Sequence, residues 1–160
     1  MKYSGIHFND ITAAPGLSVT FYTQGCPHHC PGCHNPETWD FEGGQEFTIS
    51  TLHEIINGLT AQGIQRNLCV MGGEPLCYQN SYLTAAVVTA VKTQVPGAKI
   101  YVWTGYTYEQ LLEIDCPHIN TVLQLSDYLI DGPYIEAERD ITLPMRGSRN
   151  QRIIDLSKKI

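Results

Sequence analysis

Three cysteines lie within eight residues near the start of the chain, in the segment CPHHCPGC of residues 26–33. Cys26, Cys30 and Cys33 have the spacing CxxxCxxC. Thiolates are soft, strong ligands that suit iron–sulfur centres. Three of them can bind three irons of a cubic [4Fe-4S] cluster and leave the fourth iron open to a substrate or cofactor, whereas a cluster that only carries electrons normally has a fourth cysteine. The spacing therefore predicts that these three cysteines are the metal ligands of a reactive [4Fe-4S] cluster.

Two other roles for these cysteines stay open at this point. A disulfide framework needs an oxidising compartment, and three cysteines cannot all pair without recruiting a distant one. A structural zinc site could combine Cys30 and Cys33 with Cys26 or with a histidine at position 28, 29 or 34. Structural zinc sites usually bring a second ligand pair, and the sequence has no second CxxC and no HxxxH. The pattern therefore favours the cluster over a zinc-binding interaction module.

The composition is that of a globular chain. Its 160 residues, 42% of them apolar and 16% charged, predict one domain over residues 1–160 with a real core. The formal charge of −6 argues against a nucleic-acid binder. The N-terminal residues lack the apolar core of a signal peptide, and no run of about 18 apolar residues predicts a membrane span. Six cysteines without a secretion signal predict a cytoplasmic protein, because thiols stay reduced there.

Strand and helix patterns alternate along the chain and must position the cysteines. β-Branched and aromatic runs predict strands at residues 17–23, 67–71, 99–104 and 128–131, with one more around 151–155. Apolar residues at helical spacing predict helices at residues 48–62 and 80–95. Two shorter helices are expected at residues 108–112 and 119–125. Thr51 and Glu54 are placed as a capping box for the first helix, and Asn80 as the N-cap of the second.

This alternation predicts an α/β fold of parallel strands joined by helical crossovers. Too few units exist to close an eight-stranded barrel, so a partial, open (βα) barrel is expected. In such folds the chemistry lies where strands end and helices begin. Every unusual segment falls at such a place: the cysteine loop and residues 72–75, 103–106 and 131–132. We therefore expect these segments to line one pocket.

Several residues at these strand ends are candidates for binding a ligand. Gly72 and Gly73 allow close approach to the backbone, and Glu74 adds an anion that can bind an amino group. Thr104 can donate to a carboxylate. Arginines in residues 146–152 can pair with a carboxylate or meet an acidic partner. For the Gly-Gly-Glu segment the alternative is an ordinary tight turn. For the segment around Thr104 it is a turn with core aromatics, and for residues 146–152 it is a solvated loop.

The remaining cysteines and the histidines beside the cluster motif have simpler expected roles. Cys69, Cys77 and Cys116 share no ligand spacing, so we expect all three to be structural. The histidines at positions 28, 29 and 34 are expected either to donate hydrogen bonds to groups around the cluster or to face solvent, rather than to bind iron.

Taken together, these motifs resemble the radical S-adenosylmethionine (SAM) superfamily, in which CxxxCxxC follows the first strand and a Gly-Gly-Glu segment follows the second. Within it the chain is similar to the activating proteins of anaerobic ribonucleoside-triphosphate reductases. The resemblance covers essentially the whole chain. The matching segments include residues 25–28 (GCPH), 31–33 (PGC), 38–39 (TW), 72–76 (GGEPL), 102–106 (VWTGY), 131–132 (DG) and 146–151 (RGSxNQ).

The resemblance implies a truncated radical SAM core with two cofactors, the [4Fe-4S] cluster and SAM. Glu74, with the backbone of Gly72 and Gly73, would bind the amino group of SAM, with Thr104 nearby. Gly32 stands where the superfamily usually has an aromatic residue, so an adenine contact there would come from its backbone. Three further positions depart from the family pattern. His34 stands where a tyrosine is expected after the third cysteine, Ser18 where arginine is frequent and Pro133 where relatives have lysine.

The implied activity is that of an activating enzyme. An electron from a flavodoxin- or ferredoxin-type donor would cleave SAM, and the resulting 5′-deoxyadenosyl radical would generate a glycyl radical on the anaerobic ribonucleoside-triphosphate reductase. No side chain of the enzyme is needed as a general acid or base, since the cofactors carry the chemistry. Activation of a different glycyl-radical enzyme is the alternative.

Overall fold

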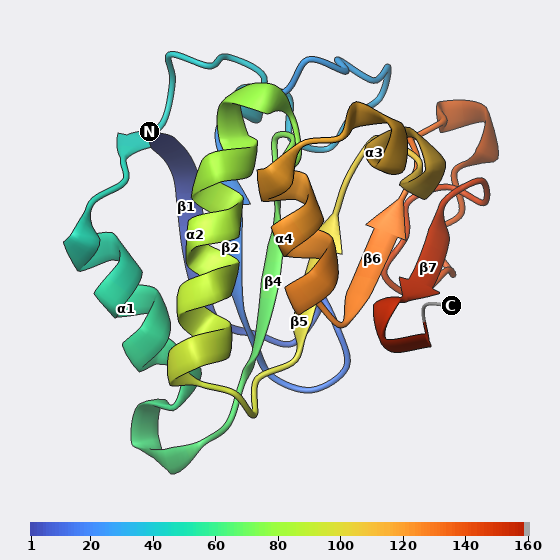
Figure 1. Ribbon diagram of the computed structural model, residues 1–160. Helices are drawn as coiled ribbons and strands as arrows, with labels where there is room; N and C mark the ends of the chain where they lie inside the picture. The colour runs from blue at the N-terminus through green and yellow to red at the C-terminus, as the bar shows by residue number, and fades with distance from the viewer. Residues whose placement is uncertain (159–160) are drawn as a thin grey trace.

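Seven strands form one mixed sheet, and helices cover one of its faces (Figure 1). The computed structural model describes residues 1–158, so the last two residues of the expected domain lie outside the described residues. The strand order across the sheet is β3-β1-β2-β4-β5-β6-β7. The strands are β1 (Lys2–Asp10), β2 (Ser18–Thr23), β3 (Gln45–Glu46), β4 (Asn67–Gly72), β5 (Ile100–Trp103), β6 (Tyr128–Asp131) and β7 (Arg152–Asp155).

The centre of the sheet is parallel and its edges are antiparallel. Strands β2, β4, β5 and β6 run parallel, which confirms the prediction for this part. The prediction of parallel strands is wrong for β7, which runs antiparallel to β6. The reason is that residues 132–151 hold no crossover helix, only the 3-10 turn Glu136–Glu138, so the chain returns beside β6. Strand β1 was not predicted, and it pairs antiparallel with β2.

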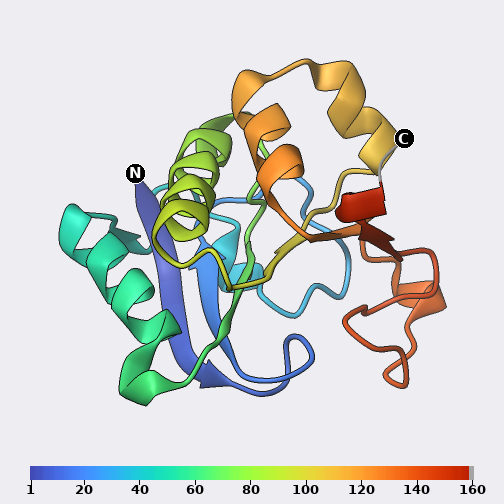
Figure 2. The ribbon, with the colours of Figure 1, turned by 60° about the horizontal axis from the view of Figure 1, so that its bottom comes forward.

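Helices α1 (Ile49–Leu59), α2 (Tyr78–Gln94) and α4 (Pro117–Leu125) lie on one face of the sheet, and the short α3 (Tyr108–Ile114) follows β5 (Figures 1 and 2). All four helices were predicted from the sequence, with differences at their ends. Within residues 1–158, no helix has the length and apolar character needed to cross a membrane.

The N-terminal caps of two helices differ from the prediction. Helix α1 is capped by Thr48, which forms a reciprocal capping box with Thr51, so the predicted box of Thr51 and Glu54 is wrong. The Thr51 hydroxyl oxygen accepts a hydrogen bond from the backbone N–H of Thr48, so Thr51 lies inside the first turn and is not the cap. Helix α2 begins after Cys77, and Asn80 is not its cap. The Asn80 side chain is drawn inward, because its amide donates to backbone carbonyls at the strand ends.

The main core lies between the helices and the sheet. Alternate strand residues such as Phe21, Val70 and Val102 are fully buried against apolar residues of α1, α2 and α4. The opposite face carries a second, smaller cluster that includes Cys69 and Tyr101. Burial raises the pKa of the Cys69 thiol to about 11. This thiol therefore stays protonated inside the sheet, as expected for a structural cysteine.

Candidate functional site

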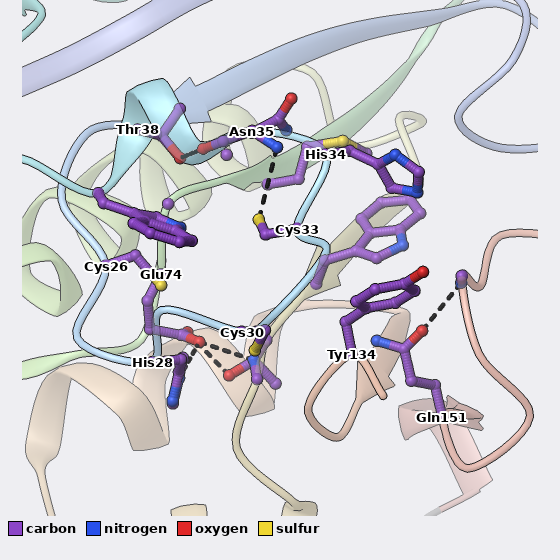
Figure 3. A pocket seen from close by; sticks show the side chains of 18 of the residues that line it. Cys26, His28, Cys30, Cys33, His34, Asn35, Thr38, Glu74, Tyr134 and Gln151 are labelled. Carbon is purple, nitrogen blue, oxygen red and sulfur yellow. Dashed lines mark hydrogen bonds and ion pairs between the residues drawn. The ribbon is translucent and has the colours of Figure 1, made fainter. Parts of the chain in front are cut away.

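The ends of the parallel strands meet in one cavity of about 210 Å³ (Figure 3). The structure thus brings together segments that lie far apart in the sequence, at the edge where the pattern placed them. Residues of the predicted segments that line it include Cys26, Cys30, Cys33, Gly72, Gly73, Glu74, Trp103, Thr104, Gly105, Gly132, Gly147 and Gln151. Gly32, which was also predicted to contact a cofactor, is not among the described residues that line this cavity.

The cysteine loop is closed at its base by backbone hydrogen bonds. The N–H of Gly25 donates to Thr38 O at 2.7 Å, and the N–H of Cys26 donates to Trp39 O at 3.2 Å. The Gln24 side chain adds a bond to Asp40 O at 2.7 Å. These bonds fix the two ends of the loop that carries the thiols, so the loop leaves β2 in a defined direction.

The loop also packs directly on the end of β4. Gly72 has a φ of 115°, in the region that favours glycine. A Cβ on Gly73 would lie 2.3 Å from the carbonyl oxygen of Gly25, which leaves no room for a side chain. The same carbonyl accepts from the backbone N–H of Glu74 at 2.9 Å. The two glycines therefore allow the Gly-Gly-Glu segment to lie against the root of the cysteine loop.

The three thiols differ in exposure. Cys26 is buried, and burial raises the pKa of its thiol to about 11. Cys30 and Cys33 are partly exposed, and the backbone N–H of Asn35 donates to Cys33 Sγ at 3.4 Å. All six cysteines are free, as far as the described residues extend. Among residues 1–158, no three or more Cys, His, Asp or Glu side chains are grouped so that they could hold a metal ion.

The chemistry of the donor set fits an iron–sulfur cluster. Three thiols on one short loop line the cavity (Figure 3). Iron–sulfur clusters take thiolate ligands, one on each iron, and are tuned by hydrogen bonds to the sulfurs. The Nε1–H of Trp39, another residue of the cavity wall, is buried and has no hydrogen-bond partner among the described residues. Such a donor is available to a sulfur atom.

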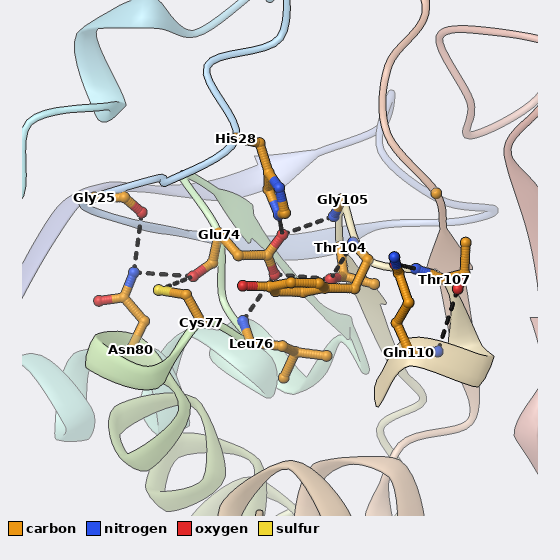
Figure 4. Close-up of polar contacts among 12 residues, drawn as sticks. Gly25, His28, Glu74, Leu76, Cys77, Asn80, Thr104, Gly105, Thr107 and Gln110 are labelled. Carbon is orange, nitrogen blue, oxygen red and sulfur yellow. Dashed lines mark hydrogen bonds and ion pairs between the residues drawn. The ribbon is translucent and has the colours of Figure 1, made fainter. Parts of the chain in front are cut away.

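Glu74 is the most buried charged group of the site, with an exposed fraction of 1% (Figure 4). Its Oε1 accepts from the backbone N–H of Leu76 at 2.9 Å and the hydroxyl of Thr104 at 2.8 Å. Its Oε2 accepts from the backbone N–H of Gly105 and from His28 Nε2, both at 2.7 Å. A carboxylate offers about four acceptor positions, so these donors occupy them all.

Three predicted residues thus have contacts that the sequence did not indicate. The hydroxyl of Thr104 donates its hydrogen bond to the carboxylate of Glu74, a residue of the same chain. Gly32 has a φ of 78°, and a Cβ there would lie 2.8 Å from the carboxylate of Glu136. His28, expected only as a donor or as a solvent-facing residue, is the partner of Glu74. Its position between two ligand cysteines, in the family-matching segment of residues 25–28, was the signal that pointed to the site.

Other residues of the cavity wall were missed altogether. Tyr134 and Met145 come from the irregular segment between β6 and β7, where no periodic pattern could place them. Gln151, which lies in the segment 146–151 already singled out from the sequence, lines the cavity beside them, and its Oε1 accepts from the backbone N–H groups of Gly147 and Ser148. In Figure 3, Tyr134 and Gln151 stand on the side of the cavity away from His28 and Glu74.

An ion pair fixes the end of β6 beside the cavity. Asp131, with an exposed fraction of 1%, accepts from Arg152 Nε at 3.0 Å and from the backbone N–H of Tyr108 at 2.8 Å. Arg152 also bonds the exposed Glu109. This arginine of the segment 146–152 thus pairs with carboxylates of its own chain.

Substitution of this arginine is expected to destabilise the fold. Arg152→Met leaves the buried carboxylate of Asp131 without its cation, and because the arginine is about half exposed we expect a loss of about 2 kcal/mol in the free energy of unfolding. Glu109→Gln removes only the exposed partner and is expected to change stability far less. Urea unfolding of both variants checks this. Equal midpoints for Arg152→Met and the native protein would contradict it.

Comparison with known proteins assigns this chain to a class. A family model described as a 4Fe-4S single cluster domain matches residues 12–154. The chain is 36% identical over 152 residues to the anaerobic ribonucleoside-triphosphate reductase-activating protein of Escherichia coli (strain K12), covering 94% of this chain and 96% of that protein. The proteins of the same name from Enterobacteria phage T4 and Vibrio cholerae are also 36% identical, over 153 and 154 residues and 96% of this chain, and 93% and 97% of their own lengths are covered.

The chain is therefore a 4Fe-4S single-cluster domain protein. More narrowly, it belongs to the family of anaerobic ribonucleoside-triphosphate reductase-activating proteins. This confirms the resemblance found in the sequence motifs.

Proposed function

We propose that this protein is a radical SAM activating enzyme for an anaerobic ribonucleoside-triphosphate reductase. The observation that carries the proposal is the convergence of three thiols and the Gly-Gly-Glu segment on one cavity at the strand ends. The names of the relatives support the reductase, rather than a different glycyl-radical enzyme, as the target. The sheet would then be a truncated radical SAM core, a partial open barrel forming a single domain.

In this proposal Cys26, Cys30 and Cys33 hold a [4Fe-4S] cluster. When bound, it supplies the electron that cleaves SAM to methionine and a 5′-deoxyadenosyl radical, which takes a hydrogen atom from a glycine Cα of the reductase and leaves a glycyl radical. The electron comes from a flavodoxin- or ferredoxin-type donor. The protein's own residues bind, orient and shield the reactants.

The strand-end residues would bind SAM. The backbone of Gly72 and Gly73 takes the amino group of its methionine part. Glu74 was expected from the sequence to bind this group as well, but its four internal hydrogen bonds fill its acceptor positions, so in this proposal it holds the backbone of the two glycines in place. Thr104 belongs to the same site through its bond to Glu74. Gly32, at the turn between the second and third cysteines, offers only backbone to the adenine.

Anaerobic reconstitution with iron and sulfide, followed by reduction with dithionite in the presence of SAM, tests this proposal. We expect about four irons per chain, together with methionine and 5′-deoxyadenosine in equal amounts. Stoichiometric zinc without iron, or a reduced cluster that leaves SAM intact, would contradict the proposal.

A further inference from the structure

His28 joins the cysteine loop to the far side of the cavity (Figure 4). It stands between two predicted cluster ligands, Cys26 and Cys30. Its side chain donates from Nε2 to Glu74 Oε2 at 2.7 Å. A carboxylate only accepts hydrogen bonds, so this contact fixes the ring with its proton on Nε2.

Glu74 collects donors from three separate segments. Leu76 belongs to its own turn, Thr104 and Gly105 follow β5, and His28 belongs to the cysteine loop. The buried carboxylate would be costly without these donors, and with them it ties the three segments to one point. Since its acceptor positions are filled, Glu74 has none left for a further donor such as an ammonium group.

The imidazole ring also fits tightly in its place. A Cβ on Gly105 would lie 2.6 Å from His28 Cδ2 and 2.7 Å from Nε2, so the ring lies directly against the backbone there. The ring of Tyr106 meets it edge-on, with 4.6 Å between the centroids. The side chain of His28 is only 19% exposed. The Nε2–H of the ring therefore has a hydrogen-bond partner in Glu74, and the ring itself packs against Gly105 and Tyr106.

We propose that His28 is a positioning residue, whose side chain holds the cysteine loop over the Gly-Gly-Glu segment by bonding Glu74. Glu74 then acts on the bound SAM through the placement of this segment and not through a spare acceptor of its own. The proposal rests on the proposed function, because it assigns a role within the same cluster and SAM site.

Three variants of the reconstituted protein test this role. His28→Phe keeps a ring and removes the N–H, whereas His28→Gln keeps a neutral donor at similar reach. His29→Asn is the matched control, because His29 lies in the same loop between the same cysteines, is exposed, and has a φ of 47° that asparagine tolerates. The readouts are the rate at which a chelator removes iron, and the change that SAM causes in the electron paramagnetic resonance (EPR) spectrum of the reduced cluster.

For His28→Phe we expect iron loss about five- to tenfold faster, the effect of one lost hydrogen bond, and a diminished spectral change on addition of SAM. His28→Gln should restore both toward the native values, and His29→Asn should match the native protein. Rescue by Gln separates positioning from general packing, because glutamine lacks the ring but keeps the donor. Native behaviour of His28→Phe in both readouts would overturn the proposal, as would failure of His28→Gln to restore either.

A second variant covers the case in which His28→Phe does not fold, as judged by thermal unfolding. Gly105→Ala places a methyl group against the ring and keeps the backbone N–H that bonds Glu74, so we expect the same two defects from displacement of His28. Native behaviour of Gly105→Ala would then overturn the proposal. Failure of the native protein to form a cluster or cleave SAM would instead refute the proposed function, so the two failures are distinguishable.

Discussion

Cys30→Ala is expected to abolish the cleavage of SAM to 5′-deoxyadenosine. Cys30 is the middle one, in sequence, of the three cysteines that line the cavity, and alanine offers no ligand in its place. Two thiolates leave two irons of the cube without a protein ligand, so a stable cluster with one open iron cannot form. The measurement is chromatography of 5′-deoxyadenosine after anaerobic incubation with dithionite and SAM, and the product should fall to the level of a protein-free control.

Cys116→Ser is the matched control for this prediction. Cys116 is the N-cap residue of α4, away from the cavity wall, and serine suits such a position. We expect its cluster content and SAM cleavage to equal those of the native protein. Continued cleavage by Cys30→Ala, or equal loss in both variants, would contradict the assignment of the three ligands.

Gly73→Ala is expected to lower the rate of SAM cleavage by about 10²-fold, because a shift of about 1 Å at a reacting centre has effects of this size. The added Cβ would meet the carbonyl oxygen of Gly25 at 2.3 Å and that of Thr38 at 3.0 Å. Both contacts are to backbone atoms, which cannot rotate away, so the cysteine loop and the Gly-Gly-Glu segment must move apart. Iron content per chain and the initial rate of 5′-deoxyadenosine formation measure the effect.

Gly5→Ala provides the control, since a Cβ on Gly5 in β1 would have no atom within 4 Å. This variant should retain the native rate and iron content. A native rate for Gly73→Ala would show that the close approach of the two segments is not needed for the reaction.

The site could be located from the sequence because its position follows from topology. Parallel strands place their carboxyl ends at one edge, so the segments after β2, β4, β5 and β6 had to meet once these strands were recognised. Because these strands are buried, their sequences contain apolar runs that are easy to recognise, such as residues 67–71. By contrast, β1 is a half-exposed strand near the sheet edge with no clear alternation, and the antiparallel return of β7 depends on a long irregular connection.

The contacts within the site could not be predicted in the same way. Glu74 and His28 are 46 residues apart, and their hydrogen bond exists only because two loops approach each other in the folded chain. The same holds for Asn80. Its residue type predicts a helix N-cap, but in the structure its side-chain amide donates to the carbonyls of Gly25 and Glu74. Local propensity does not contain such long-range partners.

The most direct test of the central claim is EPR spectroscopy of the reductase itself. The reconstituted protein is reduced, mixed anaerobically with SAM and the anaerobic ribonucleoside-triphosphate reductase, and the spectrum of the reductase is recorded. We predict a glycyl radical signal that requires SAM and the native cysteines and that is absent with Cys30→Ala. Absence of this signal, in a mixture where the protein holds a reduced cluster and cleaves SAM, would contradict the proposed function.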